Sequence, residues 1–168
     1  MPVDFFDNPH KETTRKPRFG LCDDVAPVDC PHTPAYIDEA DEDKWAAVVA
    51  NANLKTVTFY PIDNCIEVLR PDGQMDNRCD GLLEYDKHLI FVELKDRDCQ
   101  GWVGDGLNQL KITIRNFKAY HDAGSYDSIK AQLCNKQRPR AVVSCKVDIE
   151  KFKDETGHKV SVDRNITI

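Results

Sequence analysis

Apolar and polar residues follow a strand-like pattern most clearly in residues 78–97, near the middle of the chain. Residues 89–94 are apolar and rich in strand-forming side chains, apart from a carboxylate at Glu93, and Lys95 follows them. Because side chains alternate across a strand, Phe91, Glu93 and Lys95 share one face. We expect the opposite face to pack in the core and this face to carry a functional site.

The preceding segment, residues 80–85, predicts the partner strand of a hairpin. With a two-residue turn at residues 86–87, the antiparallel register sets Asp80 directly opposite Glu93. Like charges in directly opposed positions destabilise a sheet, so this pair predicts a compensating cation. Two carboxylates are hard oxygen ligands that suit Mg²⁺ or Mn²⁺, and Lys95 on the same face could orient an attacking water.

Periodicity elsewhere predicts a mixture of helices and strands, so we expect the α/β class in its α+β form. The expected helical segments are residues 35–53, 105–121 and 126–135. The other expected strands are residues 56–61, 65–69, 140–149 and 159–168. Residues 1–34 are rich in proline and charge and are expected to form a largely irregular arm, followed by one domain over residues 35–168.

The hairpin resembles a known active site. The strings Cys-Asp-Gly-Leu-Leu-Glu-Tyr at residues 79–85 and Ile-Phe-Val-Glu-Leu-Lys at residues 90–95 are similar to the active-site hairpin of the PD-(D/E)xK nuclease superfamily. The resemblance implies a restriction-endonuclease-like α-βββ-α-β core, with a mixed central sheet flanked by helices, and metal-dependent hydrolysis of phosphodiester bonds. The proline that gives the motif its name is absent, and Cys79 stands before Asp80.

The same resemblance implies a role for each residue of the hairpin. Asp80 and Glu93 would bind Mg²⁺ or Mn²⁺, and Leu94 would lend its backbone carbonyl to the metal. Lys95 would position the attacking water and offset charge in the transition state. DNA is the implied substrate, because it is the commoner one in the superfamily that the hairpin resembles.

Two residues outside the hairpin are also implied. Gln109 lies on the expected helix after the second strand, at a place from which such a glutamine reaches the active site. Glu42 lies on the expected first helix, from which a glutamate would approach the metal. The alternatives are a glutamine on the helix surface and an acidic group that complements the helix dipole.

Length, composition and net charge limit the kinds of partner that the chain is expected to bind. The chain has 168 residues, of which 40% are hydrophobic and 31% charged, so one globular domain with its own core is expected. The net charge of -6 argues against indiscriminate binding to nucleic acid, although basic residues outnumber acidic ones between residues 105 and 140. The small size suggests a homodimer or a larger complex on DNA.

Residues 1–10 lack the features of a signal peptide, and no apolar run reaches the length of a membrane-spanning helix. We therefore expect a cytoplasmic protein without a membrane partner.

The seven cysteines lack CxxC spacing, which favours free thiols in a reducing compartment. Cys22, Cys30 and His32 leave open a zinc site, but their spacing is loose.

The sequence is also compatible with two other functions. The first is a catalytically inert module on the same fold, which would bind nucleic acid or a protein. The second is a cysteine-based enzyme or redox sensor that uses Cys79 or Cys99 near His88. The hairpin favours the nuclease over both, because it places two carboxylates and a lysine together.

Overall fold

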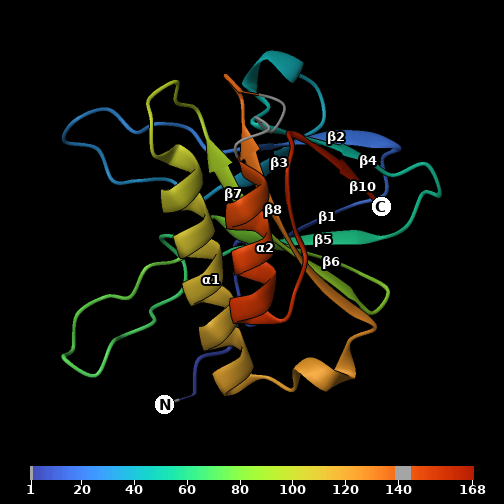
Figure 1. The fold of residues 1–168 in the computed structure, drawn as a ribbon. Coiled ribbons are helices and arrows are strands. Elements are labelled where there is room, and N and C mark those ends of the chain that lie inside the picture. Colours follow the sequence, from blue (N-terminus) through green and yellow to red (C-terminus); the bar gives the residue numbers. More distant parts are fainter. Residues whose placement is uncertain (1, 139–144) are drawn as a thin grey trace.

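Two β-sheets and a pair of helices form three layers in the computed structural model, which describes residues 2–138 and 145–168 (Figure 1). The strands of the larger sheet are β1 (Glu12–Thr14), β5 (Val57–Pro61), β6 (Gly81–Tyr85), β7 (His88–Lys95), β8 (Ser128–Asn135) and β9 (Val160–Val162). The strands of the smaller sheet are β10 (Asn165–Thr167), β4 (Ala47–Ala50), β2 (Arg18–Cys22) and β3 (Tyr36–Asp38). The helices are α1 (Trp102–Tyr120) and α2 (Lys146–Thr156), with short 3-10 turns η1 (Glu42–Lys44) and η2 (Ala123–Ser125).

The larger sheet has the order β1-β5-β6-β7-β8-β9, and the smaller sheet has the order β10-β4-β2-β3. In the larger sheet β5, β6 and β7 run antiparallel, whereas β7, β8 and β9 run parallel. The mixed sheets and two helices confirm the expected α+β class. No helix within the described residues is long and apolar enough to cross a membrane.

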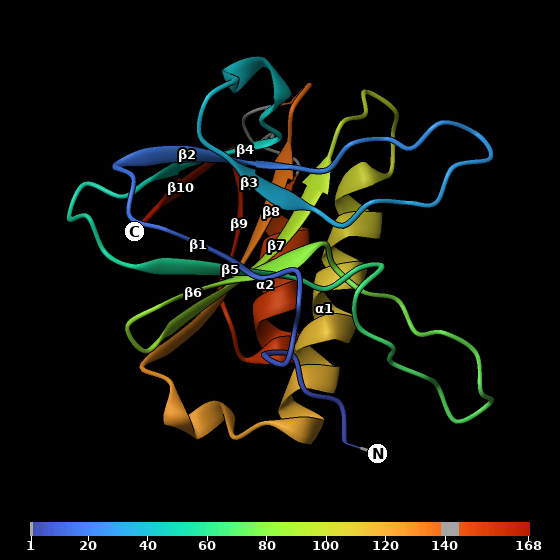
Figure 2. The ribbon, with the colours of Figure 1, turned by 180° about the vertical axis from the view of Figure 1, so that it is seen from behind.

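The two faces of the larger sheet pack against different layers. Leu89 and Phe91 of β7 lie in a core with α1 and α2, whereas Ile90, Val92 and Leu94 lie in a second core with the smaller sheet. Figure 2, from behind, shows the smaller sheet on the side away from the helices. The prediction that Ile90, Val92 and Leu94 face a core is therefore confirmed. Helix α1 covers the opposite face of β7.

The hairpin has the predicted register. Tyr85 pairs with His88 across a two-residue turn, and Gly81 pairs with Val92. One further step along this register sets Asp80 opposite Glu93, as the sequence predicts.

Helix α1 confirms the prediction for residues 105–121 but begins three residues earlier, at Trp102. Gly101 precedes it with a φ of 89°, a left-handed conformation that glycine adopts without strain. The predicted apolar stripe is buried through Leu107, Leu110, Ile114 and Phe117.

The predicted helix over residues 35–53 is wrong, since this segment forms β3, η1 and β4. Its acidic residues build a turn instead of a helix start: Asp38 Oδ1 accepts hydrogen bonds from the backbone N–H groups of Ala40 and Asp41. The following Ala47–Ala50 segment pairs with β2 on one side and β10 on the other. Tertiary pairing therefore overrides the helical spacing of its apolar residues.

The predicted helix over residues 126–135 is also wrong. This segment contains β8, which pairs in parallel with the whole length of β7. Ile129, Ala131 and Leu133 alternate into the core under the helices, so the true period is two.

Three other expectations need correction. Residues 65–69 form no named strand, and Leu69 makes only an isolated bridge with Met75. The expected strand over residues 140–149 falls partly outside the described residues, and from Lys146 onward it is helix α2. The expected strand over residues 159–168 is divided into β9 and β10, which belong to different sheets.

Residues 1–34 contribute to both sheets, whereas the sequence predicted a largely irregular arm. β1 pairs with β5, and β2 pairs with both β3 and β4. Phe5 and Phe19 are fully buried, one in each core. Their long-range partners stabilise strands that the local composition does not favour.

Alanine substitutions at two glycines of α1 are expected to change the free energy of unfolding in opposite directions. A Cβ atom at Gly106 would lie 2.4 Å from Cδ1 of the fully buried Leu133, whereas one at Gly104 would meet no heavy atom of the described residues within 4 Å. Gly104→Ala is expected to raise the free energy of unfolding by about 0.5–1 kcal/mol, because alanine favours the helix. Gly106→Ala is expected to lower it by about 1–3 kcal/mol through overpacking. Urea denaturation of both variants tests the pair, and shifts in the same direction would contradict it.

Candidate active site

Four of the predicted site residues come together where the hairpin meets α1. Asp80 directly precedes β6, Glu93 and Lys95 lie near the end of β7, and Gln109 lies on α1. Figure 1 shows the end of β7 beside the start of α1. The hairpin register and the helix therefore bring side chains from three elements to one end of the sheet.

Lys95 is the centre of a hydrogen-bonded group. Its Nζ donates to Glu93 Oε1 at 2.5 Å and to Gln109 Oε1 at 2.6 Å. Gln109 Nε2 donates in turn to the backbone carbonyl of Arg78 at 3.1 Å. Gln109 thus orients the ammonium group and ties α1 to the chain that leads into Asp80.

Asp80 is fixed by the backbone of the facing strand. Its Oδ2 accepts a hydrogen bond of 2.6 Å from the N–H of Leu94, which lies between Glu93 and Lys95. The side chain of Asp80 is buried, and its residue is only 8% exposed. The Asp80 carboxyl is consequently held against the Glu-x-Lys segment of β7.

Glu93 carries an oxygen that has no partner. The residue is 1% exposed, and its Oε2 makes no hydrogen bond to the described residues. A buried carboxylate oxygen without a partner is costly, and a bound cation or a proton relieves that cost. Burial raises the pKa of Glu93 to about 7, against the opposing effect of the Lys95 charge.

Burial disfavours the ionised form of the Asp80 carboxyl as well. Burial, and then the negative charge of Glu93, raise the pKa of Asp80 well above its usual range. The N–H of Leu94 and the charge of Lys95 act in the opposite direction. Two buried carboxyls that disfavour each other's ionisation form a site that a cation would stabilise.

Two further acidic residues influence this pair, and the sequence interpretation missed them. Asp23 follows β2 and Asp63 follows β5. After burial and the opposing charge of Lys95, the negative charges of Asp23 and Asp63 add to the raised pKa of Glu93. Asp23 follows β2, which was not predicted, so its approach to Glu93 had no sequence signal. Asp63 comes two residues after β5, which was predicted, but the break at this position was interpreted only as a turn.

Glu42 is not part of this group. It lies on η1, where its exposed side chain forms an ion pair with Arg18. Residues 35–53 form β3, η1 and β4 in place of the expected helix. Glu42 is therefore not directed toward Asp80 and Glu93.

The donor set suits a hard cation. Mg²⁺ commonly takes one or two protein carboxylates and completes its shell with water and substrate phosphate. Asp80 and the free Oε2 of Glu93 supply such a pair. Within the described parts of the chain, no group of three or more His, Cys, Asp or Glu residues is arranged to hold a metal, and this includes Cys22, Cys30 and His32.

The geometry gives little support to cysteine chemistry. Cys79 is fully buried, and burial followed by the charge of Glu93 raises the pKa of its thiol well above the usual value. His88 lies at the opposite end of β7 from Glu93, and its Nδ1 hydrogen-bonds with Ser128 Oγ. Cys99 is exposed in the connection to α1.

The Thr113 hydroxyl links the backbone before Asp80 to helix α1. Its Oγ1 accepts a hydrogen bond of 2.7 Å from the N–H of Cys79 and donates one of 2.8 Å to the carbonyl of Gln109. Thr113→Val leaves a buried N–H without an acceptor, so it is expected to lower the free energy of unfolding by about 1–3 kcal/mol. Thr156→Val, at the half-buried end of α2, is the matched control and should cost less in the same denaturation experiment. An equal loss in both variants would contradict the assigned role.

Comparisons of the chain with protein-family models, with curated proteins and with solved structures found no match. The case for a function therefore depends on the geometry and chemistry of the residues themselves.

Proposed function

We propose that the chain is a metal-dependent nuclease that hydrolyses phosphodiester bonds in DNA. The observation that carries the proposal is the buried pair of Asp80 and Glu93, with one free carboxylate oxygen, beside an ammonium group that Gln109 holds in place. A site that only stabilised the fold would have little use for two buried carboxyls in opposed positions.

The arrangement of elements supports the resemblance to the PD-(D/E)xK superfamily. The order β5-β6-β7-α1-β8, with β7 and β8 parallel, corresponds to the βββ-α-β part of the core that the resemblance implies. The initial helix of that core has no counterpart, since β3, η1 and β4 occupy its place in the chain. The proposal of a restriction-endonuclease-like fold thus applies to the part that carries the site.

The proposed metal ligands are Asp80, Glu93 and the carbonyl of Leu94. A bound Mg²⁺ or Mn²⁺ supplies charge stabilisation at the phosphate and lowers the pKa of a bound water. Lys95 orients the attacking water and offsets negative charge as it develops on the phosphate. Gln109 limits the motion of the Lys95 ammonium, so this group is positioned before the substrate arrives.

We include a homodimer in the proposal, because two copies would present one site to each strand of a duplex. The net charge of -6 means that such a complex would rely on local contacts with DNA.

The test is cleavage of supercoiled plasmid, linear duplex and single-stranded DNA with Mg²⁺ or Mn²⁺, and with a chelator. The wild-type protein should cut only with a divalent ion, and Asp80→Asn should be inactive although folded. Asp86→Asn, at the exposed turn of the same hairpin, is the matched control and should cut as the wild type does. Absence of cutting of DNA and RNA, together with no stabilisation by Mn²⁺, would replace the proposal with an inert binding module.

A further inference from the structure

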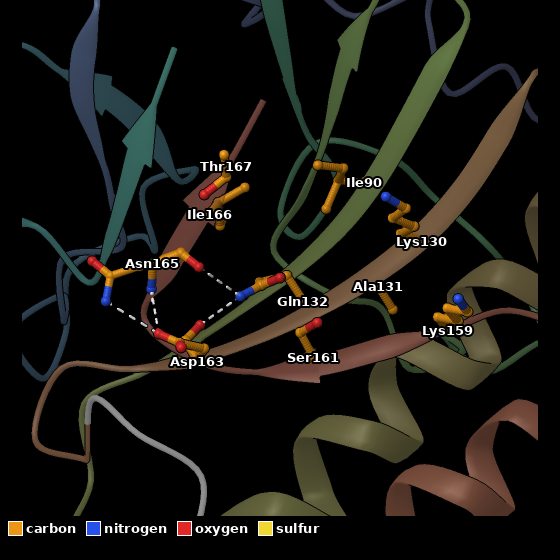
Figure 3. Close-up of a pocket in the computed structure, with 10 residues that line it drawn as sticks. All are labelled: Ile90, Lys130, Ala131, Gln132, Lys159, Ser161, Asp163, Asn165, Ile166 and Thr167. Carbon is orange, nitrogen blue, oxygen red and sulfur yellow. Dashed lines mark hydrogen bonds between the residues drawn. The ribbon is translucent and has the colours of Figure 1, made fainter. Parts of the chain in front are cut away.

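A pocket of about 320 Å³ lies on the face of the larger sheet that points away from α1. Its floor is formed by β7, β8 and β9, and β10 of the smaller sheet forms one wall (Figure 3). This volume is within the range of pockets that bind small molecules. The pocket is therefore separated by the sheet from the site that contains Glu93.

Two lysines occupy neighbouring positions on its floor. Ala131 pairs with Val160 in the parallel register of β8 and β9, so Lys130 lies beside Lys159. Ile90 pairs with Lys130, which places these lysines on the same face as Ile90. Adjacent strands are only about 4.8 Å apart, and like charges at such positions destabilise a sheet. Neither lysine forms an ion pair with a carboxylate of the described residues.

The rest of the lining supplies hydroxyl and apolar groups. Ser161 lies in β9, two residues after Lys159, which directly precedes that strand, and Thr167 projects from the β10 side. Ile90 and Ile166 contribute apolar surface between them. A pocket that contains lysines in neighbouring positions as well as hydroxyl donors is suited to an anion with several oxygens.

The single carboxylate of the lining lies away from the lysines. Asp163 is four residues beyond Lys159, about 13 Å along an extended strand. Its Oδ1 already accepts hydrogen bonds from the backbone N–H and side-chain amide of Asn165. Figure 3 shows Asp163 and Asn165 at the opposite end from Lys130 and Lys159, so the pocket has one cationic end.

Hydrogen bonds hold the wall between the two sheets in place. Gln132 is 7% exposed, and its Nε2 donates to the carbonyls of Asp163 and Asn165 at 2.7 and 3.1 Å. These bonds tie β8 to the connection after β9 and to the first residue of β10. A pocket with a fixed wall loses less conformational entropy on binding than one that has to form.

We propose that this pocket binds the phosphate group of a nucleotide, with Lys130 and Lys159 contacting the phosphate. A phosphate dianion matches the charge of the two lysines and can accept a hydrogen bond from the Ser161 hydroxyl on the neighbouring strand. The apolar wall and the space toward Asn165 receive the uncharged remainder of the molecule. The inference does not depend on the proposed nuclease, because none of these residues belongs to the Glu93 site.

The test measures binding of inorganic phosphate, deoxyadenosine monophosphate and a short single-stranded DNA by calorimetry and by amide chemical shifts, without divalent ions. Lys130→Gln and Lys159→Gln are each expected to weaken nucleotide binding roughly tenfold, and added salt should weaken it further. Lys87→Gln, in the exposed hairpin turn, is the control for a lost positive charge and should bind as the wild type does. Glu93→Gln should also bind normally, which separates this result from the fate of the nuclease proposal.

The probes also distinguish the source of the phosphate. Tighter binding of the oligonucleotide, in competition with the mononucleotide, would assign the pocket to a nucleic acid chain, whereas preference for the mononucleotide would assign it to a free ligand. Either result supports a phosphate site. No saturable binding of any probe, or equal weakening by Lys87→Gln, would overturn it.

Discussion

Without divalent ions, Glu93→Gln is expected to remove a pH dependence of stability that the wild-type protein has. The pKa of Glu93 is about 7 in the folded protein against 4.5 in its ordinary state, because the side chain is buried. The folded state therefore binds more protons than the unfolded state between these values, and the free energy of unfolding falls as the pH rises through this window. The loss amounts to about 3 kcal/mol at 1.36 kcal/mol per pKa unit.

Urea denaturation in a chelating buffer between about pH 4 and about pH 8 measures this effect. The stability of Glu93→Gln relative to wild type should increase toward high pH. Mn²⁺ should stabilise the wild-type protein near pH 8, where the carboxyl is ionised, but should have little effect on the variant. Asp86→Asn should follow the wild type throughout. Parallel pH profiles of Glu93→Gln and wild type would show that the pKa of Glu93 is not raised in the folded protein.

The features that the sequence predicted correctly depend on local structure. The register of the β6–β7 hairpin follows from its two-residue turn, so the opposition of Asp80 and Glu93 required no knowledge of distant residues. Helix α1 could be predicted because its apolar stripe lies within one segment of about 20 residues. Gln109 then reaches Lys95 because the helix starts close to the end of β7.

The features that the sequence did not predict depend on distant partners. Residues 128–135 form a strand because β7 and β9 provide hydrogen bonds on both sides, although the same residues can be read as a helix. β4 similarly depends on β2 and β10, which come from the two ends of the chain. Asp23 comes close enough to affect Glu93 only after β2, one of these distant strands, has joined the smaller sheet.

The larger sheet carries paired like charges on both of its faces. Asp80 and Glu93 are opposed on the helix side, and Lys130 and Lys159 are adjacent on the other. Each pair costs stability in the absence of a ligand of opposite charge. The carboxylate pair is buried and has a positioned lysine beside it, whereas the lysine pair is exposed at one end of a pocket. This difference supports catalysis at the first pair and binding at the second.

Lys95→Gln is expected to separate catalysis from metal binding. The substitution removes the ammonium group but retains an amide that can donate to Glu93, so a folded protein is expected. Cleavage should fall by about 10²- to 10³-fold, since the substitution removes the group that we propose orients the water and offsets developing charge. Stabilisation by Mn²⁺ should persist, because Asp80 and Glu93 remain. The measurements are the initial cleavage rate at saturating Mn²⁺ and the shift of the melting temperature.

The control for a lost lysine is Lys111→Gln, which lies on α1 and pairs with Glu155 at the surface. Its cleavage rate should stay close to that of the wild type. Because the charge of Lys95 lowers the pKa of Glu93, its loss moves that pKa upward, and the metal titration of Lys95→Gln must be carried to higher pH. Wild-type cleavage by Lys95→Gln would remove Lys95 from the mechanism. If Lys95→Gln lost Mn²⁺ stabilisation as completely as Asp80→Asn, Lys95 would be a positioning residue for the carboxylates and would have no separate role in the chemical step.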